Sequence, residues 1–336
     1  MIEPVITFHK PWAWAIEPVN GCNLKCGHCA TRLFPKGRIR FIKEKVWRDM
    51  FHVIKEVSPR CRVEMAMAGE PLLHPDMLHF LRIAREISPD SQIQITTNGT
   101  MLLAGKYKYK DLFQAGANII YTDMYGPRDE FRKLANQSGE LWYEYHNKPK
   151  DAPGAWTYSG PDLRLITLME HPGNWPNKRK HMGRLGTFYN NLDWKAAEEF
   201  NLHPVTKPPF RRCNQPSVYS VTNYQGKYLL CCQDLMSETA GMMGEVSSGA
   251  PGFLKYWLGE KMQDVRRKLR SKCRVDISEC SRCAITFSRC DMPMWKDDPL
   301  DHYWNGSKWI LLKRWIATKP PVSFAQTRKG FNLMSK

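Results

Sequence analysis

Several features are missing from this sequence of 336 residues. It has no apolar run of the roughly 20 residues that cross a membrane as a helix. Residues 1–10 lack the apolar centre of a secretion signal, and neither internal repeats nor low-complexity linkers occur. We therefore expect a cytoplasmic protein without membrane contact, built from one large α/β domain and a smaller one.

Acidic residues are scarce relative to basic ones. The chain has 33 Asp and Glu residues against 50 Lys and Arg residues, a formal charge of +17. An excess of this kind favours a polyanionic partner, such as nucleic acid, a nucleotide substrate or an acidic electron donor like flavodoxin or ferredoxin. Basic surfaces also occur without such a role, so the charge alone leaves the partner open.

Cysteine, by contrast, is abundant, with 11 residues. The cytoplasm keeps thiols reduced, so this number favours metal or redox chemistry over a disulfide scaffold. Cys22, Cys26 and Cys29 are separated by three and then two residues. They follow residues 12–18, which predict a buried strand, and an Asn-Gly turn places them at its carboxyl end, where barrel-type α/β folds gather their chemistry.

This set of three cysteines favours an iron–sulfur site. A [4Fe–4S] cluster usually takes four thiolates, so three protein ligands leave one iron able to bind another molecule. The alternatives are a zinc knuckle and a redox thiol set, because short cysteine clusters bind zinc more often than iron.

Helix and strand patterns alternate after the cysteines. Apolar spacing predicts helices over residues 44–57, 75–87, 109–115, 130–135 and 193–200. Alternating or apolar runs predict strands over residues 63–67, 92–96, 117–122, 163–169 and 203–206. Five or six such units predict a mostly parallel sheet in an α/β fold, a partial (βα)6 TIM-like barrel.

Polar turns follow three of the predicted strands. In the first turn, Gly69 permits close backbone approach, Glu70 offers an acceptor for an ammonium group and Pro71 stiffens the chain. The next turns begin at Thr97 and Asp123, at the same end of the sheet. Alone, a Gly-Glu-Pro turn is usually only a loop, and Asp123 also suits a turn or a helix cap.

A second group of cysteines lies in the C-terminal part. Residues 217–222 and 228–232 predict a hairpin that brings Cys213 and Cys231 together, and a helix is predicted over residues 253–269. Cys280 and Cys283 then complete a set of four thiolates. Such a set suits an iron–sulfur cluster held entirely by protein, or a zinc ribbon.

The first cysteine run resembles the radical S-adenosylmethionine (SAM) superfamily, whose signature is C-x3-C-x-Φ-C with an aromatic residue usual at Φ. His28 fills that position here. The Gly-Glu-Pro turn resembles the Gly-Gly-Glu-Pro segment of this family, with Ala68 replacing the first glycine. The resemblance implies a [4Fe–4S] cluster on Cys22, Cys26 and Cys29. It also implies SAM contacts from His28, Gly69, Glu70, Pro71, Thr97, Asn98 and Asp123.

Residues 213–283 resemble the SPASM/twitch extension of radical SAM enzymes. A full SPASM domain has seven cysteines, and the later spacings are not met here, so the resemblance implies one auxiliary [4Fe–4S] cluster. Its ligands would be Cys213, Cys231, Cys280 and Cys283. Cys61, Cys232, Cys273 and Cys290 receive no role, although Cys232 or Cys290 as a hydrogen donor stays open.

The resemblance implies reductive cleavage of SAM to a 5′-deoxyadenosyl radical, which removes hydrogen from an unactivated carbon. The charge favours an anionic substrate: a nucleotide, a nucleic acid or a phosphorylated molecule. A peptide maturase and a sugar or aminocyclitol dehydrogenase or epimerase are alternatives. An iron–sulfur protein that binds nucleic acid without catalysis is another. No residue is identified as a catalytic acid or base.

The expected division of the chain has three parts. Residues 1–206 form the radical SAM partial barrel, and residues 207–292 form a small cysteine-rich α+β domain for the auxiliary cluster. Residues 293–336 mix tryptophan with lysine and arginine. We expect this tail to pack on the barrel, with nucleic-acid stacking as the alternative.

Overall fold

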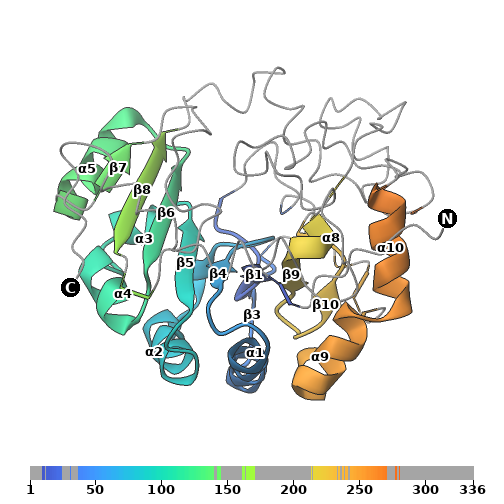
Figure 1. Ribbon diagram of the computed structural model, residues 1–336. Helices are drawn as coiled ribbons and strands as arrows, with labels where there is room; N and C mark the ends of the chain where they lie inside the picture. Colours follow the sequence, from blue (N-terminus) through green and yellow to red (C-terminus); the bar gives the residue numbers. More distant parts are fainter. Residues whose placement is uncertain are drawn as a thin grey trace, which may run out of the picture.

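The computed structural model describes residues 10–11, 13–24, 31, 37–139, 142–144, 161–162, 164–170, 213, 215–232, 234, 237, 239–240, 243–270, 277 and 280. In this part of the chain, eight strands form one sheet in the order β10-β9-β1-β4-β5-β6-β8-β7 (Figure 1). They are β1 (Ala13–Ile16), β4 (Arg62–Met65), β5 (Gln92–Thr97), β6 (Ile119–Met124), β7 (Trp142–Glu144), β8 (Leu165–Glu170), β9 (Tyr219–Thr222) and β10 (Tyr228–Leu229). Neighbours are parallel except β9 and β10, as a mostly parallel α/β sheet requires.

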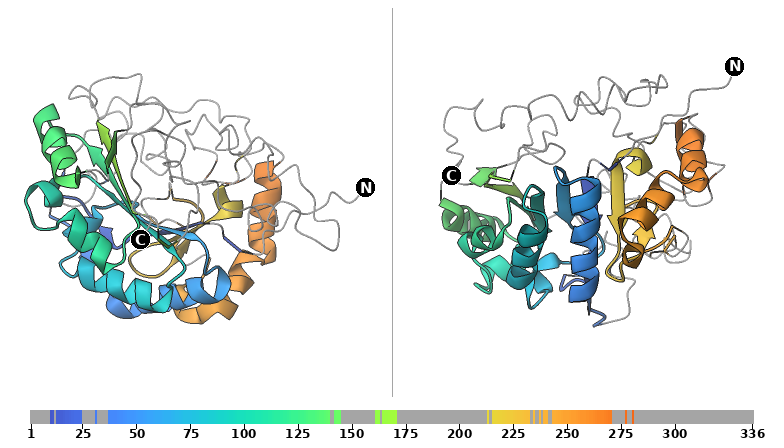
Figure 2. Two further views of the ribbon diagram at one scale, coloured as in Figure 1. Left: turned by 60° about the vertical axis from the view of Figure 1, so that its left-hand side comes forward. Right: turned by 60° about the horizontal axis from the view of Figure 1, so that its bottom comes forward.

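Helices cover one face of this sheet. The larger ones are α1 (Glu44–Val57), α2 (Met77–Ile87), α4 (Tyr109–Ala115), α5 (Arg128–Ser138), α9 (Gly249–Trp257) and α10 (Glu260–Arg270). Shorter ones are η2 (Pro71–Leu73), α3 (Thr100–Leu103), α8 (Gln215–Val218) and η7 (Val246–Ser248), and β2 (Val19–Asn20) pairs with β3 (Arg40–Phe41). Helices α9, α1, α2 and α4 lie side by side along the sheet (Figure 2). No helix among the described residues has the length and apolarity of a membrane span.

The hydrophobic core lies between the sheet and these helices. Trp14 of β1 packs against Phe253 of α9 with 4.7 Å between ring centroids, and its Nε1 donates to Ser58 Oγ at 2.7 Å. The same strand and the strands β4, β5 and β6 add further buried apolar side chains: Ile16, Val63, Met65, Ile93, Ile95 and Ile120. Because side chains alternate along a strand, the intervening residues face the other side of the sheet.

The C-terminal described elements differ in detail from the sequence pattern. The predicted hairpin is present as β9 and β10, but β9 also pairs with β1, so the hairpin extends the main sheet. The single helix predicted over residues 253–269 is instead two helices, α9 and α10, which meet at Gly259. A Cβ at Gly259 would lie 2.4 Å from the carbonyl oxygen of Lys255, so this turn of the chain needs glycine.

Candidate functional site

The start of the cysteine loop is bound to the predicted Gly-Glu-Pro turn. Gly21 and Gly69 form an isolated parallel bridge. The backbone N–H of Gly21 donates to the carbonyl oxygen of Ala68 at 3.1 Å. The backbone N–H of Glu70 donates to the carbonyl oxygen of Gly21 at 3.0 Å. A Cβ on Gly69 would lie 1.9 Å from the carbonyl oxygen of Val19, so only glycine allows this close approach.

The carboxylate of Glu70 joins two of the predicted turns. Its Oε1 accepts hydrogen bonds from the Leu72 amide at 3.0 Å and from Thr97 Oγ1 at 2.6 Å. Its Oε2 accepts from the Asn98 amide at 2.7 Å. A carboxylate has about four acceptor positions, and these bonds occupy three of them. The contacts therefore give Glu70 a structural role in holding the turn after β5 against the turn after β4.

Burial also controls the ionisation of this group. Glu70 is 2% exposed, and burial raises its pKa to about 7. The hydrogen bonds from Asn98, Thr97 and Leu72 act in the opposite direction, while the negative charge of Asp123 raises the pKa further. Asp123 of β6 therefore lies close enough to repel Glu70, which brings four predicted site residues, Glu70, Thr97, Asn98 and Asp123, to one end of the sheet.

Asn98 connects this turn to the first cysteine. Its Nδ2 donates to Asn23 Oδ1 at 3.0 Å and to Cys22 Sγ at 3.5 Å. Its Oδ1 accepts from Thr100 Oγ1 at 2.6 Å, and the same hydroxyl accepts from Asn23 Nδ2 at 2.8 Å. The Leu24 amide is a second N–H donor to Cys22 Sγ, at 3.4 Å. N–H donors to sulfur favour a thiolate, so Cys22 has the surroundings of a metal ligand.

The structure thus brings together the described residues of the first predicted site. Cys22, Gly69, Glu70, Pro71, Thr97 and Asn98 are joined by the contacts above, and Asp123 lies near them. Other predicted residues lie outside the described residues: Cys26, His28, Cys29 and Cys283. Within the described residues no three Cys, His, Asp or Glu side chains form a metal-binding group.

Described cysteines of the C-terminal part lie near the core. Cys213 and Cys280, both predicted cluster ligands, are half-buried against it, as is Cys232. Cys231 is half-buried as well, and none of the four is in a disulfide with another described cysteine. Gln215 Nε2 donates to Cys232 Sγ at 3.2 Å. These positions leave the predicted ligand set for the auxiliary cluster as a prediction.

Two other residues with perturbed chemistry are absent from the sequence-based site. Glu17 is 1% exposed, and burial raises its pKa to about 7 although Asn20 Nδ2 and the Tyr224 amide donate to it at 2.9 and 3.1 Å. It thereby ties the end of β1 to the turn between β9 and β10. Cys61 is fully buried, and burial raises its pKa to about 12, so its thiol is inert.

Comparison with known proteins shows which families and folds this chain is similar to. The model of the Radical SAM superfamily matches residues 16–148. An S-adenosyl-L-methionine-dependent 2-deoxy-scyllo-inosamine dehydrogenase of Niallia circulans is 20% identical over 269 residues, which cover 80% of this chain and 90% of that relative.

Two crystal structures share the fold. BtrN in complex with AdoMet and 2-DOIA has a TM-score of 0.57 at 17% identity, covering 81% of this chain and 92% of BtrN. Selenomethionine BtrN in an open conformation has a TM-score of 0.52 at 15% identity, and the match covers 81% of this chain and 92% of that BtrN chain. Residues 16–148 therefore form a radical SAM superfamily domain, and the protein is an enzyme.

Proposed function

We propose that the protein cleaves SAM reductively and uses the resulting 5′-deoxyadenosyl radical to oxidise an alcohol carbon of a small polyhydroxylated or aminated substrate. The observation that carries the proposal is the contact between Asn98 and Cys22 at 3.5 Å. It joins the start of the cysteine loop to the turn that Glu70 holds, so Cys22 and the proposed SAM contacts Thr97 and Asn98 lie at one end of the sheet.

The residues present fit these two groups. Cys22, with two N–H donors on its sulfur, would hold a [4Fe–4S] cluster together with Cys26 and Cys29. A bound cluster of this type supplies an electron to SAM from an external reductant, which radical SAM enzymes need. The chain's own contribution is positional. Gly69 permits close approach of backbone, and Thr97 is held by Glu70.

For the remaining proposed SAM contacts we rely on placement. Pro71, Asn98 and Asp123 lie at the same end of the sheet as Cys22. His28 belongs to the cysteine run itself. The acidic reductant would be a flavodoxin or ferredoxin, which the charge of +17 attracts.

The substrate class rests on the relative that acts on 2-deoxy-scyllo-inosamine. Removal of a hydrogen atom from an alcohol carbon leaves a carbon radical, and loss of one proton and one electron then forms the ketone. An auxiliary [4Fe–4S] cluster on Cys213, Cys231, Cys280 and Cys283, in a SPASM/twitch-type extension, would provide an acceptor for that electron. The second candidate is an anionic substrate such as a nucleotide or RNA, which the excess of 50 basic over 33 acidic residues favours.

The test is 5′-deoxyadenosine formation by the anaerobically reconstituted and reduced enzyme. Parallel reactions contain SAM with 2-deoxy-scyllo-inosamine, scyllo-inositol, nucleotides, RNA or a peptide pool. Stimulation by the first two supports the proposal, and a ketone product with one 5′-deoxyadenosine per oxidation confirms the chemistry. Stimulation confined to nucleotides or RNA would support the anionic candidate instead. Absence of SAM cleavage by an enzyme with full iron content would refute both.

A further inference from the structure

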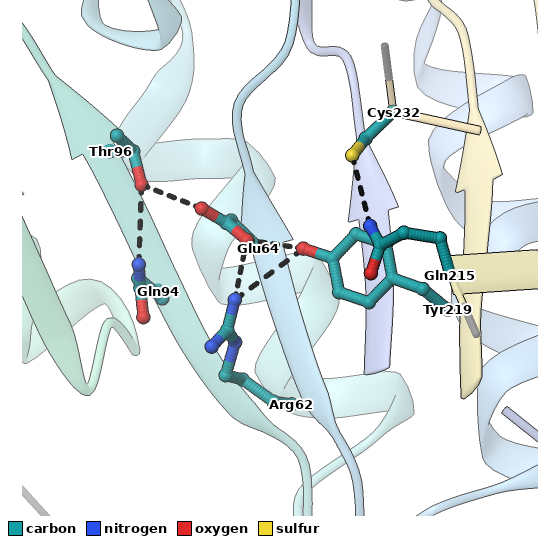
Figure 3. Close-up of polar contacts among 7 residues, drawn as sticks. All are labelled: Arg62, Glu64, Gln94, Thr96, Gln215, Tyr219 and Cys232. Carbon is teal, nitrogen blue, oxygen red and sulfur yellow. Dashed lines mark hydrogen bonds and ion pairs between the residues drawn. The ribbon is translucent and has the colours of Figure 1, made fainter. Parts of the chain in front are cut away.

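A polar cluster occupies the face of the sheet opposite α1, α2 and α9, which we call the inner face. Figure 3 shows its members, which come from three strands. They are Arg62 and Glu64 of β4, Gln94 and Thr96 of β5, and Tyr219 of β9. Register confirms the shared face, because Arg62 pairs with Gln92 and Glu64 pairs with Gln94. The inner face thus carries a charged pair where the opposite face carries the apolar core.

Small residues on β1 let the cluster extend across that strand. β1 lies between β9 and β4, so Tyr219 is two strands from Glu64, about 10 Å between backbones. Ala13 and Ala15 face them from β1, where Ala13 pairs with Tyr219 and Ala15 with Glu64. The Tyr219 hydroxyl passes over these alanines and donates to Glu64 Oε2. A larger side chain on β1 would block this contact.

Glu64 is the centre of the cluster. Its Oε2 also accepts from Arg62 Nη2 at 2.5 Å, and its Oε1 accepts from Thr96 Oγ1 at 3.1 Å. The Arg62 side chain is 1% exposed and that of Glu64 is 17% exposed. Burial lowers the pKa of Arg62, but Glu64 and Tyr219 outweigh this effect and leave it raised, so the Arg62 guanidinium keeps its charge beside the Glu64 carboxyl group.

The orientation of Gln94 follows from the two hydrogen bonds of the Thr96 hydroxyl, one to Glu64 and one from Gln94. A carboxylate can only accept, so the single proton of the Thr96 hydroxyl goes to Glu64. Thr96 Oγ1 must then accept from Gln94, and Gln94 Nε2 lies 3.2 Å away. This contact turns Gln94 Oε1 away from Thr96, as Figure 3 shows. Gln94 is 3% exposed, and no donor among the described residues makes a hydrogen bond to its Oε1.

A buried acceptor without a donor is costly, and native sites of this kind call for an explanation. We propose that Gln94 Oε1 accepts a hydrogen bond from a hydroxyl or amino group of the substrate, and that Glu64 and Thr96 are positioning residues which aim it. The inference rests on the proposed function and deepens it, since it names a residue that would bind the substrate. The two sites are adjacent in the sequence, because Thr96 directly precedes Thr97, which donates to Glu70 at the proposed SAM site.

The same chemistry selects a substrate class. The subsite offers the amide oxygen of Gln94 beside the Arg62–Glu64 ion pair. This oxygen can accept a hydrogen bond from a neutral hydroxyl group or from an ammonium group. Phosphate oxygens are acceptors, and Gln94 Oε1 is an acceptor too, so the two could not form a hydrogen bond. The structure therefore assigns to this subsite a polyol or amino polyol rather than an anion.

Gln94→Met, which removes the acceptor at similar length, is the direct test. Anaerobic enzyme with SAM is assayed for 5′-deoxyadenosine over a range of 2-deoxy-scyllo-inosamine concentrations. We expect KM to rise about tenfold with a smaller change in kcat, the effect of one lost hydrogen bond. Thr96→Val should act similarly, while Thr96→Ser retains the hydroxyl and should keep the wild-type KM. Gln225→Met, an exposed site on the β9–β10 turn, is the control for the substitution.

The double variant distinguishes a relay from separate structural effects. If Thr96 acts only by aiming Gln94, Thr96→Val with Gln94→Met should have the KM of Gln94→Met alone. Additive losses, or a wild-type KM in Gln94→Met, would overturn the proposal, and so would tighter Gln94-dependent binding of adenosine monophosphate than of scyllo-inositol. Anaerobic calorimetric titration of the SAM-loaded enzyme with each probe measures the subsite without turnover. Failure of SAM cleavage alone therefore counts against the proposed function and not against the subsite.

Discussion

The pH dependence of stability should report on the buried Glu70. Burial raises its pKa from 4.5 to about 7 in the folded chain. The folded state therefore holds the proton more tightly than the unfolded state. Its stabilising contribution is complete below pH 4.5 and is lost as the pH rises through 7. Between about pH 6 and 8, these two pKa values correspond to a loss of about 1.3 kcal/mol in the free energy of unfolding.

Glu70→Gln removes this titration but not that of Glu17, whose pKa burial also raises to about 7. The fall in stability between about pH 6 and 8 should therefore be about 2.6 kcal/mol in the wild type and about 1.3 kcal/mol in the variant. The variant should also be less stable at pH 6. If the oxygen of the new amide side chain accepts the hydrogen bonds from Leu72 and Thr97, its NH2 group faces the backbone N–H of Asn98. Two donors then face each other, which costs about 1–3 kcal/mol.

Urea unfolding at about pH 6, 7 and 8, followed by tryptophan fluorescence on anaerobic protein, measures these differences. Glu56→Gln on the exposed side of α1 is the matched control and should keep the wild-type curve. A wild-type fall in stability for Glu70→Gln would refute the reasoning, because it would mean that Glu70 does not exchange its proton in this range.

Other substitutions test the cysteine loop and its contacts. Cys22→Ala should remove most of the iron and lower 5′-deoxyadenosine formation by more than about 100-fold, as iron analysis and the SAM cleavage assay would show. Asn98→Ala removes one N–H donor from Cys22 Sγ and should make the reduction potential of the cluster more negative. Redox titration followed by electron paramagnetic resonance measures this potential. An unchanged potential would mean that Asn98 makes no N–H···S hydrogen bond to Cys22. Gly69→Ala places a methyl group 1.9 Å from the Val19 carbonyl oxygen and should cost about 2–4 kcal/mol in urea unfolding, with a neutral result contradicting the close approach.

Local patterns predicted the central units of the fold but not their long-range pairing. The helix predicted over residues 44–57 coincides with α1, and the strand over 92–96 differs from β5 by one residue. Strong apolar periodicity explains this agreement, since each segment buries one face. The pairing of Ala13 with Tyr219 has no such signal, because partners distant in the sequence leave no local pattern. The sequence pattern did not predict β7 (Trp142–Glu144), because a strand of three residues is too short to show alternation.

Short motifs carry the prediction of the candidate site. The Gly-Glu-Pro turn and the cysteine run were recognisable from spacing, and their contacts through Asn98 agree with that placement. Glu64 and Gln94 were not recognised, because alternation in a strand usually means that polar residues face solvent. Here the polar residues face inward, with Gln94 only 3% exposed. Alternation reveals that a strand has two faces but not what covers each one.

One strand positions both the proposed SAM site and the proposed substrate site. Successive residues of β5 point to opposite faces, so Thr97 reaches Glu70 at 2.6 Å while Thr96 reaches Glu64 at 3.1 Å. Both carboxylates come from the segment that begins with β4, which is paired to β5 in register. A displacement of β5 against β4 would therefore change both contacts together. Because reaction rates are sensitive to misplacement of the reacting groups by about 1 Å, this shared strand would couple the position of the proposed SAM site to that of the proposed substrate subsite.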